Sequence, residues 1–275
     1  MNSKEIIIKP QSKWVLIDLA EIWRYRELFY VFTWRDLKIR YKQTLLGVIY
    51  VVFQPIVSTV IFTIFFGNLA KIPSGNLPYS IFVLNGLIFW NFFSGSLNRA
   101  SNSMLENVNI ITKVYFPKII LPLSVMVTFF VDFVINFIIF LCYAALLGYI
   151  PNFSIILLLP LTIILTAITI IGLGLFLASI NVKYRDVRNI LPFAIQIMLF
   201  LTPVIYPLSI MTERNKFIMA LNPMTTVVEA MRTVFYADFT LNPFIILISS
   251  LSALSFLFIG LWYFHRTEQL FADIV

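Results

Sequence analysis

Long apolar stretches divide this chain, and they constrain its fold more than any other feature. An α-helix needs roughly 20 apolar residues to cross the hydrocarbon core of a bilayer, which is about 30 Å thick. Six stretches meet or approach this length: Leu45–Phe66, Tyr79–Leu97, Ile119–Leu147, Phe153–Ile180, Ile190–Tyr206 and Phe244–Phe264. We therefore predict an all-α integral membrane protein with six transmembrane helices.

The composition indicates the same class of protein. Hydrophobic residues make up 60% of the chain and charged residues only 12%, whereas a soluble domain is about one quarter charged. The net charge of +7 does not indicate nucleic-acid binding, because the charges cluster at the ends of the apolar runs without a nucleic-acid-binding motif. We expect membrane lipids to solvate most of the polypeptide.

The Lys and Arg residues are distributed unequally between alternate connections. Sixteen of the 20 lie on one side of the predicted bundle and four on the other. The basic side comprises residues 1–44, 98–118, 181–189 and the tail from 265. Because loops rich in Lys and Arg remain in the cytoplasm, we predict that both termini are cytoplasmic.

The chain divides into three predicted regions. Residues 1–44 form a cytoplasmic and interfacial segment, 45–264 the transmembrane domain and 265–275 a cytoplasmic tail. Tryptophans alternate with charged residues over Trp14–Phe32, which is typical of an amphipathic helix lying in the membrane interface. The spacing of Thr33 and Asp36 is that of a capping box and predicts that a new helix starts there.

The fifth apolar run is short and rich in proline. Pro192, Pro203 and Pro207 each remove a backbone hydrogen-bond donor, and neighbouring helices must satisfy the carbonyls that this frees. We therefore expect a helix that is kinked or partly re-entrant.

The connection between the fifth and sixth runs carries a second helical signal. Asn222 is a favourable N-cap and Pro223 suits the first helical position, so we expect a helix over Met224–Tyr236. It is apolar but too short to span, which predicts a re-entrant hairpin in the outer leaflet. Glu229 and Arg232 lie three residues apart and can pair on one face.

Residues suited to catalysis or metal binding are scarce. The one histidine, His265, directly follows the last run, and the one cysteine, Cys142, lies inside an apolar run. Neither a Ser-His site nor a His/Cys metal site can form from them, and the phosphate-binding P-loop motif is missing. We therefore predict no enzyme activity, metal or bound cofactor for this chain, and if it is ATP-driven, ATP and Mg bind to another polypeptide.

Few polar residues lie inside the predicted spans. Asp132 is the only acidic one, and Asn136 lies one turn further along the same face. A carboxylate facing lipid costs about 3 kcal/mol, so we expect Asp132 to face the bundle interior and join two helices by a hydrogen bond. The aromatic cluster Phe89–Phe93 is compatible with two interpretations. Its rings could line a sugar-conducting path, or they could face lipid.

Four local patterns together resemble the membrane subunit of type-2 ABC exporters, in the branch that exports lipid-linked polysaccharide such as O antigen and teichoic acid. They are Arg40-Tyr-Lys-Gln-Thr-Leu-Leu-Gly47 with Gln54-Pro55, Asn107–Lys118 with Pro122, Lys183–Asp186 with Pro192 and Thr202–Pro207, and Leu221–Met224 with Glu229 and Arg232. Their order and their spacing relative to the six runs cover nearly the whole chain.

This resemblance implies the transmembrane subunit of an ATP-driven exporter in the cytoplasmic (inner) membrane. It implies a homodimer bound to two copies of a cytoplasmic ABC ATPase, with a lipid-linked glycan as substrate. Two alternatives stay open, namely a drug or small-lipid exporter permease of the same fold and a secondary carrier. The chain has no internal repeat, which counts against carriers built from inverted repeats.

Three sets of site residues follow from the resemblance and from the polar and aromatic residues of the spans. The predicted substrate pathway contains Tyr50, Gln54, Asn85, Trp90, Phe93 and Asn136. The predicted ATPase-coupling surface contains Arg99, Glu106, Lys113, Tyr115, Lys118, Tyr184, Arg185 and Asp186. The predicted outer gate contains Pro203, Tyr206, Asn222, Pro223, Glu229 and Arg232.

Overall fold

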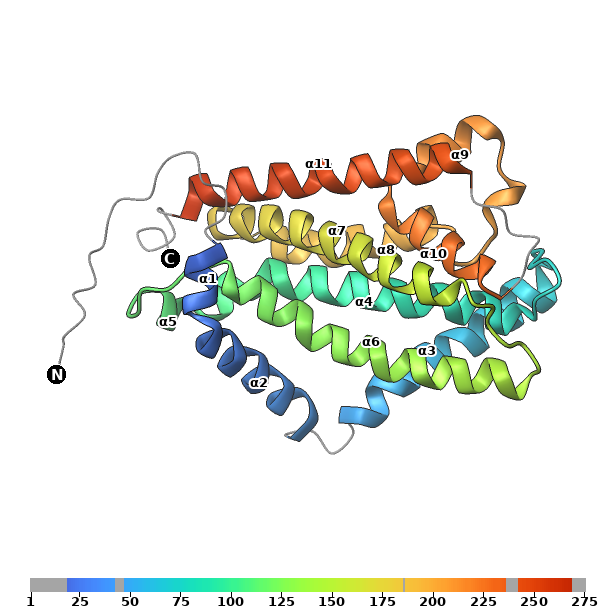
Figure 1. Ribbon diagram of the computed structural model, residues 1–275, viewed down its shortest axis with the longest axis horizontal. Coiled ribbons are helices and arrows are strands. Elements are labelled where there is room, and N and C mark those ends of the chain that lie inside the picture. The colour runs from blue at the N-terminus through green and yellow to red at the C-terminus, as the bar shows by residue number, and fades with distance from the viewer. Residues whose placement is uncertain (1–18, 43–46, 185, 236–241, 269–275) are drawn as a thin grey trace.

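The described part of the chain is helical (Figure 1). A computed structural model describes residues 19–42, 47–184, 186–235 and 242–268. Within these ranges there is no β-strand beyond a single bridge between Ser74 and Asn76. The all-α prediction is confirmed for this part of the chain.

Among the described residues, five helices are long and apolar enough to cross a membrane, which supports a multi-pass membrane protein. The first is α3 (Gly47–Phe62), which continues into a π-helix, η1 (Thr63–Leu69). The others are α4 (Tyr79–Glu106), α6 (Ile120–Leu146), α7 (Ile155–Lys183) and α11 (Pro243–Glu268). They coincide with five of the six predicted runs.

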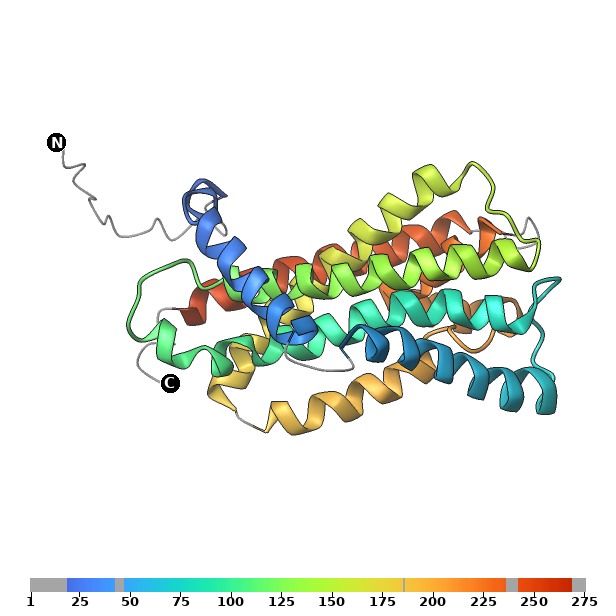
Figure 2. The same cartoon turned by 90° about the horizontal axis from the view of Figure 1, so that it is seen from below.

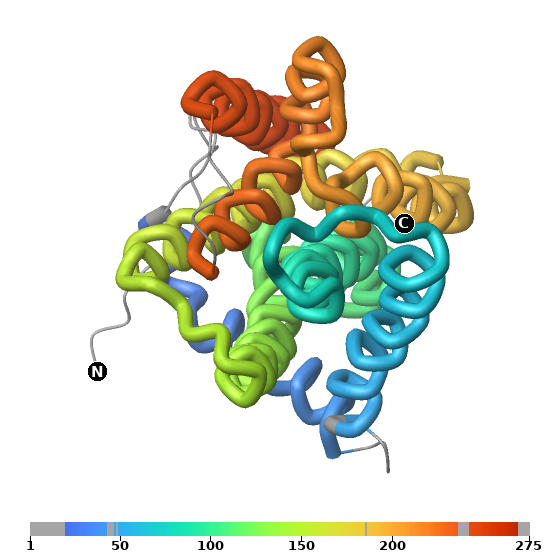
Figure 3. The backbone as a smooth tube through the Cα atoms, turned by 90° about the vertical axis from the view of Figure 1, so that its right-hand side faces the viewer, coloured from blue at the N-terminus to red at the C-terminus, as the bar shows by residue number. Residues whose placement is uncertain are grey.

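The long helices lie side by side (Figures 1 and 2). Helices α3, α4, α6 and α7 alternate in direction, whereas α11 runs in the same direction as α7. At one end lie α1 (Leu19–Arg24) and α5 (Val108–Ile111), together with the last turn of α11. We call this end the basic end, because its connections carry most of the Lys and Arg residues. The other is the opposite end, where α3 runs into η1 and α6 turns into α7 (Figure 3).

The fifth predicted run corresponds to α8 (Val187–Leu201), which is shorter than expected. Its 15 residues rise about 22 Å, less than the thickness of the hydrocarbon core. The helix ends before Pro203, because the proline ring sterically disfavours the helical backbone conformation at the preceding residue. Five helices therefore qualify as spans by length, and the sixth crossing stays a prediction.

The N-terminal region forms two helices, α1 and α2 (Arg26–Lys42), which meet at Tyr25. The predicted helix start at Thr33 is wrong, because α2 continues through it and the Thr33 hydroxyl donates to the Phe29 carbonyl one turn earlier. Trp23 is 70% exposed, as an interfacial aromatic residue would be. The first residues of the predicted interface helix, 14–18, lie outside the described part of the chain.

The predicted loop Asn98–Lys118 is also largely helical. Helix α4 continues past Leu97 to Glu106, and α5 follows at once. The Asn102 side chain donates to the Asn98 carbonyl within α4, so polar residues that suggested a loop support a helix emerging from the lipid. Only the stretch between α5 and α6 is irregular.

Helix α4 is the centre of the bundle and is largely buried. Aromatic rings pack between it and α6, with Phe89 against Phe133 at 4.9 Å between ring centres and Phe92 against Phe133 at 5.3 Å. Such edge-on and tilted pairs add to the apolar packing. The cluster that suggested a sugar path is therefore partly core.

After α8 the chain folds back at the opposite end. It forms η2 (Leu208–Ile210), α9 (Glu213–Ala220) and α10 (Pro223–Thr233). The predicted short helix is confirmed with an earlier end, and Tyr236 lies outside the described residues. Helix α10 packs against α4, α7 and α11, and its residues from Pro223 to Arg232 are buried.

Candidate functional site

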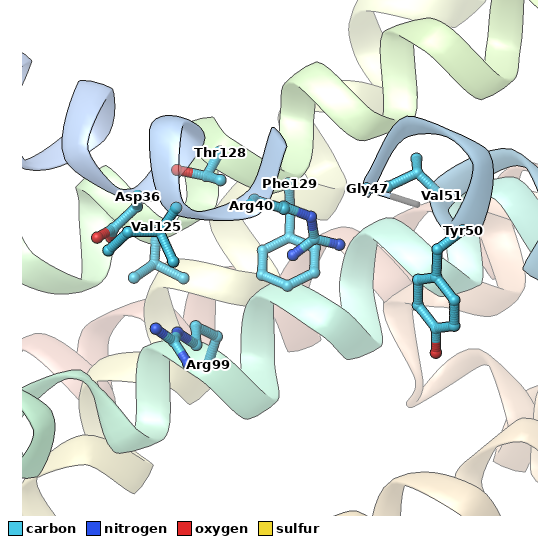
Figure 4. Close-up of a pocket in the computed structure, with 10 residues that line it drawn as sticks. Asp36, Arg40, Gly47, Tyr50, Val51, Arg99, Val125, Thr128 and Phe129 are labelled. Atoms are coloured by element: carbon cyan, nitrogen blue, oxygen red, sulfur yellow. The ribbon is translucent and has the colours of Figure 1, made fainter. Parts of the chain in front are cut away.

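A cleft lies between α2 and α3 on one side and α4 and α6 on the other (Figure 4). Its larger compartment has a volume of about 490 Å³ and lies toward the basic end. Arg40 from α2, Arg99 from α4 and Tyr50 from α3 line it. The remaining wall is mainly apolar and includes Val125 and Phe129 of α6.

Asp132 joins α6 to the end of α2. Its carboxylate lies 2.5 Å from the Arg40 guanidinium and accepts a hydrogen bond from the Tyr41 hydroxyl. The Arg40 guanidinium also lies 4.2 Å from the centre of the Phe129 ring. Burial, reinforced by the adjacent carboxylate, raises the pKa of the Tyr41 hydroxyl above its ordinary value, so this group stays a donor at neutral pH.

The position of Asp132 bears on the sequence-based prediction. Asp132 is buried, so the prediction that it faces the interior is confirmed. Its partners, however, come from α2, which precedes the first span. A lone carboxylate inside a span needs a cationic partner. The motif that begins at Arg40 contains both Arg40 and Tyr41, so the sequence offered a partner for Asp132.

A second compartment of about 100 Å³ adjoins the first, and the two share Arg40, Val51 and Phe129. It lies deeper in the bundle, near the middle of α4 and α6. Its polar lining is formed by Gln54 of α3, Asn91 and Ser94 of α4, and Asp132 and Asn136 of α6. Polar groups at this depth are costly in a membrane and usually mark a functional site.

The predicted pathway residues fall into two groups. Tyr50 lines the larger compartment, and Gln54 and Asn136 line the smaller one, so the cleft brings these three together. Asn85, Trp90 and Phe93 instead lie in the core, with 2%, 4% and 0% of their surface exposed. Asn85 donates to a carbonyl of α10. The assignment of all six to a substrate pathway stays a prediction.

A buried polar cluster surrounds Arg232 at the opposite end. Its guanidinium donates to the Glu229 carboxylate at 2.8 Å and to the Val204 carbonyl at 2.9 Å. The same carboxylate oxygen accepts the Leu208 amide at 3.0 Å, and the guanidinium lies 3.5 Å from the centre of the Phe82 ring. The predicted Glu229–Arg232 pair is confirmed, and it ties α10 to α4 and to the segment after α8.

The other predicted gate residues lie in the same region. Asn222 caps α10 as predicted by accepting a backbone amide of its first turn at 3.1 Å, and its amide donates to Thr202 at 2.7 Å. Pro203 and Pro223 are buried, and the Tyr206 hydroxyl donates to a carbonyl in the last turn of α8. The six residues thus form one connected region, and their role as a gate stays a prediction.

Three of the predicted coupling residues make contacts within the chain. Arg99 pairs with Glu106 at 3.1 Å within the last turns of α4. The Lys118 ammonium donates to the Glu268 carbonyl at 2.6 Å, and its backbone amide donates to the Glu268 carboxylate at 3.0 Å. The start of α6 is therefore fastened to the end of α11.

The remaining coupling residues are exposed at the basic end. Lys113, Tyr115, Tyr184 and Asp186 are exposed to solvent, and Arg185 lies outside the described residues. They belong to the connections after α5 and between α7 and α8, which Figure 1 places at one end of the bundle. Their role in ATPase coupling stays a prediction.

The fold and these sites define a multi-pass helical membrane protein of the permease class, with a polar cleft among its spans and exposed charges at one end. A model of the ABC-2 type transporter family matches residues 27–236, which is most of the chain. The chain therefore belongs to the ABC-2 type transporter family, as its sequence patterns predicted.

Several known proteins are similar over most of the chain. The O-antigen export system permease protein RfbA of Myxococcus xanthus is 30% identical over 79% of this chain and 84% of its own length. RfbA of Klebsiella pneumoniae is 27% identical over 90% of this chain and 95% of its own length. The polysialic acid transport protein KpsM of Escherichia coli is 23% identical over 86% of this chain and 91% of its own length.

Proposed function

We propose that the chain is the transmembrane subunit of an ATP-driven exporter that moves lipid-linked polysaccharide across the cytoplasmic membrane. The observation that carries this proposal is the match to O-antigen export permeases, which extends over as much as 90% of the chain. A polar cleft inside the membrane supports it, because a hydrophilic polymer needs polar partners on its way through lipid.

The energy source is a separate protein in this proposal. The chain has no P-loop, so ATP and Mg bind to a cytoplasmic ABC ATPase, present in two copies beside a homodimer of this chain. The exposed residues of the basic end form the docking surface. Lys118 and Glu268 then transmit movement of that surface to both α6 and α11.

The proposed topology has six crossings, with α8 completing the fifth together with the extended segment that follows it. The N-terminal helices and the tail are cytoplasmic, and α9 and α10 form a re-entrant hairpin on the outside. Helices α7 and α11 run in the same direction (Figures 1 and 2), so the chain must return to the opposite end between them, which supports an even number of crossings. The excess of Lys and Arg at the basic end supports the orientation.

A cysteine-labelling experiment tests this orientation. Cys142 is the only native cysteine, so Cys142→Ser provides a background for Lys113→Cys at the basic end and Ile150→Cys between α6 and α7. Both positions are exposed. In spheroplasts, a membrane-impermeant maleimide is expected to label position 150 at once and position 113 only after lysis. The reverse pattern would contradict the topology.

A charge reversal tests the docking surface. We expect Asp186→Lys to lower co-purification of the ATPase several-fold. Reversal of a charge at the rim of an interface turns attraction to the partner into repulsion, which slows association and opposes binding. Glu213→Lys makes the same reversal on an exposed residue at the opposite end and should have no effect. If Asp186→Lys inserts normally and retains both the ATPase and export, the docking assignment is incorrect.

Deletion of the gene tests the function itself. We expect surface polysaccharide to disappear and lipid-linked glycan to accumulate inside the cell, with both effects reversed by a plasmid copy. A strain with normal surface polymer and no accumulation would overturn the proposed substrate and favour the drug or small-lipid exporter.

A further inference from the structure

The deeper compartment of the cleft has more polar lining than helix packing requires. Within the part of the chain that the structure describes, the side chains of Gln54, Asn91 and Ser94 line it without a hydrogen bond to another residue. Asn136 donates to the Asp132 carbonyl at 2.9 Å, which leaves its own carbonyl oxygen available. Gln54 is exposed and Asn91, Ser94 and Asn136 are half-buried, so their free polar groups are accessible to a polar occupant of the compartment.

The charges of this compartment indicate an uncharged occupant. Arg40 and Asp132 are the two charged residues among those that line it, and they pair at 2.5 Å. A phosphate would meet the Asp132 carboxylate, and an ammonium group would meet the Arg40 guanidinium. Either ion would have to compete with this pair, in which Asp132 is buried and Arg40 half-buried, and loss of a buried carboxylate's partner is unfavourable.

The chemistry of the lining narrows the occupant further. A carboxamide both donates and accepts hydrogen bonds, so three of them, with the Ser94 hydroxyl, match a group rich in hydroxyls. Phe129, which is half-buried, supplies an apolar ring surface beside these amides. A sugar residue combines these two features, because its hydroxyls lie around the rim and its C–H groups form apolar faces.

The two compartments lie in a row. The deeper one, about 100 Å³, accommodates several waters or the hydroxyl-bearing edge of one sugar residue. The larger one, about 490 Å³, continues from it toward the basic end, and Figure 4 shows Tyr50 and Arg99 at its wall. A polymer of sugar residues could occupy both compartments at once, with the hydroxyl-bearing edge of one residue in the deeper one.

We propose that this cleft is a sugar-binding site within each copy of the chain, and this inference rests on the proposed function. Gln54, Asn91 and Asn136 exchange hydrogen bonds with the hydroxyls of an uncharged sugar residue in the exported polymer. The Arg40–Asp132 pair holds α2 against α6 and so forms one wall. The site thereby selects for neutral, hydroxyl-rich segments of the substrate.

Photo-crosslinking in the complete transporter tests the proposal directly. Asn91 is replaced by p-benzoylphenylalanine in cells whose polymer is labelled with a tritiated hexose. Ser255, on the lipid-exposed face of α11, carries the same group in the control. We expect light-dependent radiolabel on the chain from position 91 and not from 255. Label at neither position during active export, or equal label at both, would overturn the proposal.

Removal of the amides is the second measurement. Gln54→Leu combined with Asn91→Leu keeps the side-chain size and removes groups that bond no described residue, so we expect normal thermal stability. The initial rate of export should fall about ten-fold, as the loss of two hydrogen bonds predicts. An unchanged rate would mean that the compartment holds water only. If gene deletion still abolishes export in that case, the proposed function stands and this inference alone fails.

Discussion

Replacement of Arg232 by alanine is expected to cause one of the two largest losses of stability in this chain. The side chain is 0% exposed and pairs with Glu229 at 2.8 Å. Its removal leaves the Glu229 carboxylate buried with only the Leu208 amide as a donor. Loss of one partner of a buried ion pair costs about 3–5 kcal/mol. We expect a fall of several degrees in the thermal transition of the detergent-solubilised protein.

The same hairpin offers a matched control. Lys216 and Glu213 also lie three residues apart and pair at 2.6 Å, but Glu213 is largely exposed. Exposed pairs contribute about 0–1 kcal/mol, so Lys216→Ala should change the transition little. The double variant Arg232→Met with Glu229→Leu should recover much of the loss, because it removes both buried charges. Equal effects of Arg232→Ala and Lys216→Ala would contradict the buried cluster.

Replacement of Gly260 by leucine is the second variant with a large expected effect. Helices α7 and α11 pack side by side (Figure 1), and a Cβ atom on Gly260 would lie 2.0 Å from the Gly172 carbonyl oxygen. The clash is with backbone, so a rotamer change cannot relieve it. Helix association in lipid depends on such close approach. We expect Gly260→Leu to abolish recovery of monodisperse protein.

Ser255→Leu is the control for this variant. It introduces the same side chain on the same helix at an exposed position, where the side chain extends into lipid. We expect monodisperse protein in normal yield. If Gly260→Leu gave the same elution profile in size-exclusion chromatography as Ser255→Leu, the close crossing of α7 and α11 would be incorrect.

The local features of this protein could be read from its sequence. The apolar runs predicted five helices closely, because lipid leaves a 20-residue apolar stretch few other structures. Asn222 and Pro223 predicted the start of α10, since helix caps depend on adjacent residues. The spacing of Glu229 and Arg232 predicted their pair for the same reason. Its burial depends on α4 and the segment after α8, which local spacing does not encode.

The predictions that were wrong or incomplete have different causes. Polar residues around Asn98 predicted a loop, but the Asn102 side chain donates to the Asn98 carbonyl within α4 and so supports the helix. The cost of a carboxylate in lipid predicted that Asp132 would be buried, and the motif at Arg40 offered a cationic partner for it. The shape of the cleft depends on how the distant helix α2 packs against α6, which local sequence does not encode.

Reconstituted transport tests the central claim most directly. The purified chain and its partner ATPase are placed in sealed vesicles that carry radiolabelled lipid-linked glycan in the leaflet facing the ATPase. We expect addition of ATP to move the glycan to the other leaflet, where it becomes protected from an added glycosidase, and a non-hydrolysable ATP analogue to give no protection. Glycan that remains fully digestible while the complex hydrolyses ATP in intact vesicles would contradict the account.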